Sequence, residues 1–233
     1  MIRRHARPAS FSWALKCVQE TVTILRQMGL PIGEDPDLKP WRTFLTRQAN
    51  ATEEVRIALV GKYVELQDAY KSILESLSQA AIYNDRKLKV ESVQSEGITP
   101  ENVADKLGHV DGIVICPGFG SRGIEGKLVA AQYARENDIP TFGICLGMQC
   151  LTIEFARNVL GYPKANSVEI DEKTPHPVID IMEEQKAITN MGGTMRLGAF
   201  DCIVREGSKT FEAYQQEHIQ ERHRHRYEFN NDY

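Results

Sequence analysis

A single cysteine between two glycines is the strongest chemical signal in the sequence. Residues 143–147 read GICLG, with Cys145 at the centre. A short apolar run precedes the cysteine and a helical pattern follows it, which is typical of a strand–nucleophile–helix turn. The start of the helix would bring backbone N–H groups and a partial positive charge to the sulfur, favouring a thiolate and stabilising a developing oxyanion. A structural cysteine buried at a strand end explains this pentapeptide equally well.

Two further glycine-rich segments are candidate ligand loops. Residues 117–123 (PGFGSRG) directly follow another apolar run. Ligands of open α/β sheets bind beyond the carboxyl ends of the strands, so this loop and Cys145 would line one crevice. Residues 191–198 (MGGTMRLG) could bind an anion through Arg196 and backbone N–H groups. Taken alone, each segment is explained as well by an ordinary loop or turn.

A basic run, residues 221–228 (ERHRHRYE), is the fourth candidate. Such a run is usually a solvated face. Its two histidines stand two positions apart without cysteine or carboxylate ligands in a zinc-binding pattern. The net charge of −4 also argues against a nucleic-acid surface. We therefore expect no metal site and no nucleic-acid partner.

The pattern around these residues predicts the elements that position them. Short apolar runs alternate with helical patterns from residue 55 onward. We expect strands at 57–60, 88–93, 112–115 and 140–144, and helices at 70–81, 99–107, 124–137 and 148–160. This alternation predicts an α/β fold with an open, mainly parallel sheet and helices on both faces. Beyond about residue 165 the pattern loosens into loops and short strands.

The rest of the chain is less informative. Residues 1–30 are unassigned, although the apolar spacing within 13–30 is typical of a helix. Prolines punctuate residues 31–54, which predicts a linker, so the domain would occupy residues 55–233. No apolar run approaches the roughly 20 residues of a membrane span, and no secretory signal is visible. The five cysteines form no CxxC pair. We expect a cytoplasmic protein with reduced thiols and no membrane partner.

Taken together, the motifs resemble a known family. Residues 143–149 (GICLGMQ) resemble the nucleophile motif of the class-I, triad-type glutamine amidotransferases. Further motifs narrow the resemblance to the CTP synthases, and they occur at 58–63 (ALVGKY), 117–127, 165–169 (ANSVE), 192–198 and 221–228. The resemblance runs from about residue 31 to the last residue and implies the flavodoxin-like fold of these amidotransferases.

This resemblance implies a function for the site. The family hydrolyses glutamine to ammonia, which passes to a separate synthetase (amidoligase) domain where UTP, activated by ATP, is aminated to CTP. By resemblance, Cys145 is the nucleophile and forms a γ-glutamyl thioester. The backbone N–H groups of Gly118 and Leu146 match the oxyanion hole of the family.

The resemblance also implies a binding site for glutamine. Gln149 and Glu169 match positions that hold its amino end, and Arg226, with Tyr227 beside it, matches the residue that pairs with its α-carboxylate. The partners implied are L-glutamine and the synthetase domain. No cofactor is expected in this domain, because ATP, Mg and UTP belong to the synthetase domain. GTP is the family's allosteric activator, and residues 119–127 match the loop tied to that response.

The sequence departs from the family pattern near its end. The triad is expected to finish with a His-Pro-Glu segment, but the His-Pro at 176–177 is followed by Val178. We therefore expect a domain that is truncated at its C-terminus, lacks the synthetase domain and turns over glutamine poorly. Two alternatives remain open: a non-catalytic module that binds glutamine or GTP or docks on a synthetase, and another cysteine hydrolase on a similar sheet.

Overall fold

The computed structural model describes residues 20–31, 37–66, 68–182, 199–222 and 225–233. The chain divides into two compact units. One comprises Met1–Glu54 and Glu75–Leu88, and the other comprises Val55–Leu74 and Lys89–Tyr233. Among the described residues, no helix has the length and apolar character needed to cross a membrane.

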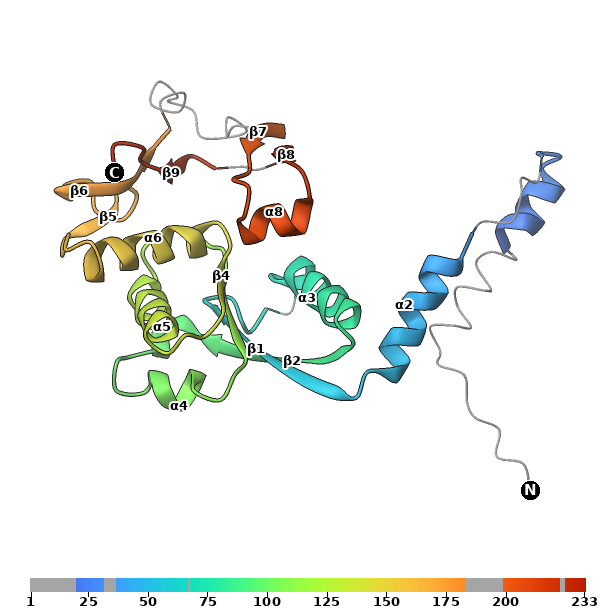
Figure 1. Ribbon diagram of the computed structural model, residues 1–233, viewed down its shortest axis with the longest axis horizontal. Helices are drawn as coiled ribbons and strands as arrows, with labels where there is room; N and C mark the ends of the chain where they lie inside the picture. The colour runs from blue at the N-terminus through green and yellow to red at the C-terminus, as the bar shows by residue number, and fades with distance from the viewer. Residues whose placement is uncertain (1–19, 32–36, 67, 183–198, 223–224) are drawn as a thin grey trace. The chain divides into compact units, whose positions relative to one another are not determined.

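A four-stranded sheet forms the centre of the larger unit (Figure 1). Its strands are β1 (Glu53–Gly61), β2 (Arg86–Gln94), β3 (Gly112–Ile115) and β4 (Thr141–Gly143), in the order β2-β1-β3-β4. Strand β3 runs parallel to both β1 and β4. The strand order reverses between β1 and β3, and in such sheets ligands bind beyond the carboxyl ends of the strands at this point. The predicted α/β fold with a mainly parallel sheet is confirmed.

Helices α4 (Val103–Leu107) and α5 (Ile124–Glu136) pack on one face of this sheet. Alternate strand residues such as Ala58 and Ile113 meet Ala131 of α5 in the core. This arrangement follows from the two-residue period of a strand and the apolar stripe of a helix. The short 3₁₀ helix η1 (Ser95–Gly97) also lies against α5.

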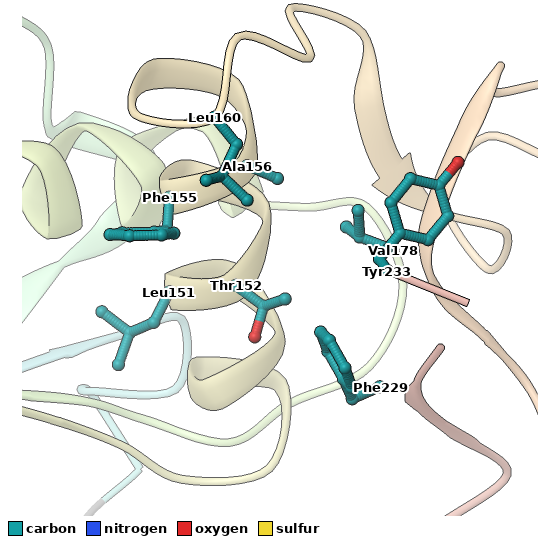
Figure 2. A pocket seen from close by; sticks show the side chains of 8 residues that line it. All are labelled: Leu151, Thr152, Phe155, Ala156, Leu160, Val178, Phe229 and Tyr233. Atoms are coloured by element: carbon teal, nitrogen blue, oxygen red, sulfur yellow. The ribbon is translucent and has the colours of Figure 1, made fainter. Parts of the chain in front are cut away.

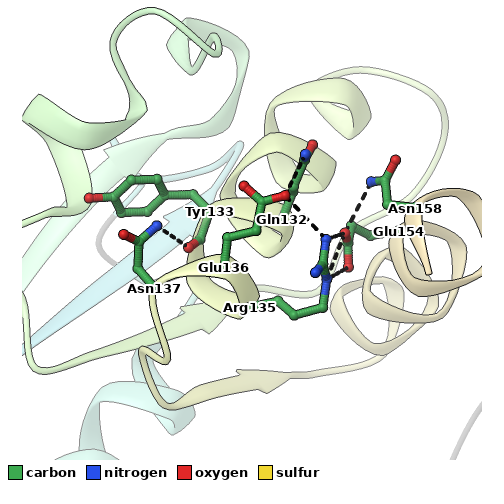
Figure 3. A network of polar contacts seen from close by, with 7 residues as sticks. All are labelled: Gln132, Tyr133, Arg135, Glu136, Asn137, Glu154 and Asn158. Carbon is green, nitrogen blue, oxygen red and sulfur yellow. Dashed lines mark hydrogen bonds and ion pairs between the residues drawn. The ribbon is translucent and has the colours of Figure 1, made fainter.

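Helix α6 (Leu146–Asn158) lies beside α5, and the Arg135–Glu154 ion pair joins the two helices (Figure 3). On its other side α6 packs against a second sheet, made of β5 (Ala165–Ser167), β6 (His176–Ile181) and β9 (Tyr227–Phe229). Strand β5 is parallel to β6, and β9 is antiparallel to it. A third, two-stranded sheet pairs β7 (Ala199–Ile203) with β8 (His218–Arg222), and α8 (Lys209–Tyr214) lies between them in the chain.

The smaller unit contains a helix where we expected a linker. Residues 20–27 are helical, as the spacing within 13–30 predicted for that part, and α2 (Lys39–Asn50) follows. Pro40 stands in the first turn of α2, where its missing N–H breaks no helical hydrogen bond. A proline taken from sequence as a sign of a linker therefore begins a helix. Helix α3 (Lys71–Tyr83) spans residues of both units.

Candidate active site

Cys145 occupies a strained turn between β4 and α6. Its backbone has φ 58° and ψ −113°, in the left-handed region that side-chain-bearing residues rarely adopt. The flanking glycines make this turn possible. A Cβ on Gly147 would lie 1.9 Å from the Ile115 carbonyl oxygen, and one on Gly143 would lie 2.6 Å from the Gly147 backbone. The segment GICLG therefore forms the sharp strand-to-helix turn that its spacing predicted.

Two backbone N–H groups face the sulfur of Cys145, those of Leu146 and Gly118, and hydrogen bonding to them lowers the pKa of the thiol. Leu146 begins α6, and Gly118 lies in the loop that follows β3. The structure thus brings together at the sulfur the two donors that the sequence assigned to an oxyanion hole.

The thiol itself is not ionised as the sequence suggested. We expected the helix start to favour a thiolate, but burial outweighs the two N–H groups and raises the pKa of Cys145 above its ordinary value. The Glu169 carboxylate contributes in the same direction, and the Lys127 ammonium opposes it. Burial therefore favours the protonated thiol, and a base that accepts its proton would assist attack by the sulfur.

Glu169 lies next to this group of residues. It follows β5, and its Oε1 accepts a hydrogen bond of 3.2 Å from the N–H of Gly120. Its own N–H donates to Ser167 Oγ at 3.2 Å. These contacts hold a half-buried carboxylate beside the loop that carries Gly118, where it could bind an ammonium group.

Gln149 lies on α6 one turn after Cys145, and it reaches β9. The side chain is 4% exposed, and its Nε2 donates to the carbonyl oxygen of Tyr227 at 3.2 Å. Within the described part of the chain, its buried Oε1 has no hydrogen-bond partner. The buried Nε of Arg226, the residue before Tyr227, likewise has none there. Buried polar atoms are normally paired, so an unpaired acceptor and donor are expected of a site that awaits a polar ligand.

Some of the predicted segments lie outside the described residues. These are the glycine-rich segment 191–198 and two residues of the basic run, His223 and Arg224. The ring of His176, from the His-Pro pair, packs against the Tyr162 ring, with the two ring centroids 4.6 Å apart. Across the described ranges, no group of three or more His, Cys, Asp or Glu side chains could hold a metal ion.

Sequence reasoning did not predict that two lysines beside the site are buried. Lys62 is 5% exposed and follows β1, while Lys127 is fully buried in α5. The spacing of Lys127 could have predicted its burial, because this lysine lies on the same helical face as three buried residues, Ile124, Leu128 and Ala131. The signal for Lys62 was its position directly after an apolar parallel strand, at the end of the sheet where ligands bind.

An apolar pocket lies elsewhere in the larger unit. Its volume is about 410 Å³, and it lies between α6, β6 and the C-terminal residues (Figure 2). The lining residues are Leu151, Thr152, Phe155, Ala156, Leu160, Val178, Phe229 and Tyr233. None of the predicted site residues lines this pocket, so it is separate from the cysteine site.

Residues 65–233 match the family described as glutamine amidotransferase class-I. The chain belongs to the class-I glutamine amidotransferase family. The nucleophile motif that the sequence predicted around Cys145 lies within the matched residues of this amidotransferase.

Within the family, this amidotransferase is similar to CTP synthases. It is 76% identical over 211 residues to the CTP synthase of Bacteroides fragilis and 63% identical over 211 residues to that of Porphyromonas gingivalis. Each match covers 91% of this chain, but only 40% and 39% of those relatives. The chain thus spans about two fifths of the length of the curated relatives that it matches.

A solved structure agrees with this similarity. The glutaminase domain of Trypanosoma brucei CTPS with bound acivicin superposes on this amidotransferase with a TM-score of 0.70 and 42% identity. The match covers 77% of this chain and 69% of that one. The fold and the family inferred from the sequence are therefore confirmed, and the chain is similar to the glutaminase domain of CTP synthases.

Proposed function

We propose that the site binds L-glutamine and that Cys145 attacks its side-chain amide. The observation that carries this proposal is the meeting of the Gly118 and Leu146 N–H groups at the Cys145 sulfur. When the sulfur bonds to the amide carbon, negative charge develops on the oxygen of that carbon. This oxygen would lie within reach of both N–H donors, which is the arrangement that acyl transfer requires.

The proposed reaction proceeds through a thioester. After the thiol loses its proton to a base, the sulfur forms a bond to the amide carbon and the carbonyl electron pair moves to the oxygen. Collapse of this intermediate restores the carbonyl and breaks the carbon–nitrogen bond, and the protonated nitrogen departs as ammonia. Water then cleaves the γ-glutamyl thioester, which releases glutamate and regenerates the thiol.

The polar groups around the sulfur suit the other end of glutamine. Its ammonium group would bind to Glu169 and to the unpaired Oε1 of Gln149. Its α-carboxylate would bind to Arg226, whose buried Nε lacks a partner in the described structure. Tyr227 fixes this pocket through its carbonyl oxygen, which accepts the Gln149 amide. A zwitterion needs one acid and one base placed in this way.

The ammonia would be used by a synthetase domain of the kind found in CTP synthases. In this proposal UTP is aminated to CTP there, with ATP and Mg bound to that domain and with none of them bound to the amidotransferase. GTP is the proposed activator. The support is the similarity to CTP synthases along 91% of this chain. A cytoplasmic location is part of the same proposal, in keeping with four free cysteines among the described residues.

Turnover by this chain is proposed to be slow. Among the described residues, the titratable side chains that act most strongly on the Cys145 thiol are Glu169 and Lys127, and neither is the imidazole that a triad supplies. Because general base catalysis contributes roughly 10²–10⁴-fold, glutamine binding and reaction with glutamine-like electrophiles should be easier to detect than ammonia release.

Calorimetric titration with L-glutamine tests the substrate. We expect saturable binding that Arg226→Met weakens by about ten-fold or more, because a charge-assisted hydrogen bond is lost. Arg205→Met, at an exposed arginine, is the matched control and should bind as the parent does. Absence of binding by the parent would favour another cysteine hydrolase, and binding without any reaction at Cys145 would favour a non-catalytic module.

A further inference from the structure

The loop that follows β3 is held at both ends by buried ammonium groups. Residues 116–120 read CPGFG and carry the Gly118 N–H that faces Cys145. Nζ of Lys127 donates to the carbonyl oxygen of Cys116 at 2.6 Å. Nζ of Lys62 donates to the carbonyl oxygen of Phe119. One lysine thus binds the carbonyl two residues before Gly118, and the other binds the carbonyl directly after it.

Two further contacts complete the attachment of this loop. The N–H of Cys116 donates to the Val60 carbonyl oxygen of β1 at 2.9 Å, and the N–H of Gly120 donates to Glu169. Gly118 itself is enclosed: a Cβ there would lie 2.9 Å from Cε of Lys62 and 3.5 Å from Cδ2 of Leu146. The Lys62 side chain therefore packs directly on the residue that supplies the donor.

Stability does not explain why these positions are lysines. Lys127 is fully buried and lies on the apolar face of α5, where a methionine would fill the space without the penalty of burying a charge. The titratable groups that face it are the thiols of Cys116, Cys145 and Cys150 and the ammonium of Lys62. No carboxylate forms an ion pair with it among the described residues, and burial lowers the pKa of Lys127. Buried charge of this kind is characteristic of functional sites.

We propose that Lys62 and Lys127 are positioning residues that fix the Gly118 N–H toward the oxyanion and bring two positive charges close to it. The inference rests on the proposed function, because it requires negative charge to develop on an oxygen next to Cys145. In this proposal the lysines act through their contacts to the loop carbonyls and not by binding the glutamine. Each substitution should therefore slow the reaction at the sulfur and leave the affinity for the amino-acid part unchanged.

Comparing two reagents isolates this effect. A chloromethyl ketone analogue of L-glutamine carries a carbonyl oxygen that becomes negative as the thiolate adds. Methyl methanethiosulfonate reacts with the thiolate and forms no oxyanion. Both rates are measured at Cys145 by peptide mass spectrometry on the full 233-residue chain. Their ratio cancels any change in the thiolate fraction and so reports the oxyanion donors alone.

For Lys127→Met and Lys62→Met we expect this ratio to fall by about ten-fold or more, because a donor displaced by about 1 Å loses much of its effect. The concentration of chloroketone that gives half the maximal rate should stay within about two-fold of the parent value, since only the maximal rate depends on the oxyanion hole. Lys173→Met, at an exposed lysine, is the control and should match the parent.

The outcomes separate this inference from the proposed function. A parent chain whose Cys145 resists the chloroketone but accepts the thiosulfonate overturns the proposed function, and this inference with it. A parent that reacts normally, together with lysine variants whose ratio is unchanged, overturns the inference alone. If Lys127→Met does not fold, the result for Lys62→Met decides, because Lys62 is not fully buried.

Discussion

The guanidinium of Arg135 on α5 donates two hydrogen bonds to the buried carboxylate of Glu154 on α6. Nη2 lies 2.7 Å from Oε1, and Nε lies 3.2 Å from Oε2 (Figure 3). The Glu154 side chain is 3% exposed, and its Oε1 also accepts from Asn158 Nδ2 at 3.0 Å. This pair connects α5, which follows the Gly118 loop, to α6, which begins directly after Cys145. It therefore helps to fix the distance between the two parts of the site.

Arg135→Met should destabilise the larger unit, because it leaves the Glu154 carboxylate buried without its charged partner. Arg135 is one third exposed, so solvent screens part of its interaction with the buried carboxylate. We therefore expect a loss of about 2 kcal/mol or more in the free energy of unfolding, measured by urea denaturation. Arg205→Met, the same chemical change at an exposed arginine, should change it by less than about 0.5 kcal/mol. Equal stabilities of these two variants would show that the ion pair contributes nothing to the packing of the helices.

Gly147→Ala should disrupt the nucleophile turn. A methyl group there would lie 1.9 Å from the Ile115 carbonyl oxygen, so α6 would have to move away from β3. We expect a loss of about 3 kcal/mol or more and a marked fall in the thermal midpoint. Gly97→Ala is the matched control, because a Cβ at Gly97 meets nothing within 4 Å. A Gly147→Ala chain that melts like the control would contradict the described turn.

Because the thiols of Cys116 and Cys150 are buried, we expect the free energy of unfolding to decrease at alkaline pH. Burial raises the pKa of each to about 12, whereas an unfolded thiol titrates at about 8.5. Above about pH 8.5 the folded chain therefore holds protons that the unfolded chain releases, so stability should decrease as the pH rises toward 12. Denaturation curves from about pH 8 to 11 measure this slope.

Cys150→Ala removes one of the two titrating thiols, so its stability should fall less steeply over the same pH range. Cys202→Ser is the control, because Cys202 is exposed and should not alter the slope. A parent chain whose stability is flat across this range would show that these thiols are not buried as described.

Gln149→Leu should weaken glutamine binding. The change removes the unpaired Oε1 proposed to accept from the substrate ammonium, together with the Nε2 contact to Tyr227. We expect the dissociation constant to rise by about ten-fold, which calorimetry with L-glutamine would measure. Gln216→Leu offers a control with the same chemical change at an exposed side chain. Undiminished affinity in Gln149→Leu would remove Gln149 from the proposed binding site.

Local patterns predicted the sheet and the nucleophile turn because both depend on short-range rules. The strand at 112–115 is observed as Gly112–Ile115, and the helix at 124–137 as Ile124–Glu136. Apolar runs between glycines are sufficient to predict such elements. The helix in residues 31–54 was not predicted because Pro40 was interpreted as part of a linker. Proline is common both in loops and in the first turn of a helix, where Pro40 lies.

Long-range packing could not be predicted from local sequence patterns. The protonated state of Cys145 depends on how much of the chain surrounds it, and the helix start alone suggested the opposite. The burial of Lys62 depends on the Phe119 carbonyl, 57 residues away in the chain. Gly118, by contrast, was matched to its role through the family motif, and the structure brings its N–H to the sulfur.

Competition at Cys145 would show whether L-glutamine binds beside this sulfur. The full chain is treated with the chloroketone analogue while L-glutamine or D-glutamine is added, and the rate of modification is followed on each cysteine peptide by mass spectrometry. We expect that Cys145 alone reacts rapidly and that L-glutamine, but not D-glutamine, slows the reaction saturably. Equal modification of Cys145 and the exposed Cys202, or a rate that L-glutamine leaves unchanged, would contradict a glutamine site at this sulfur.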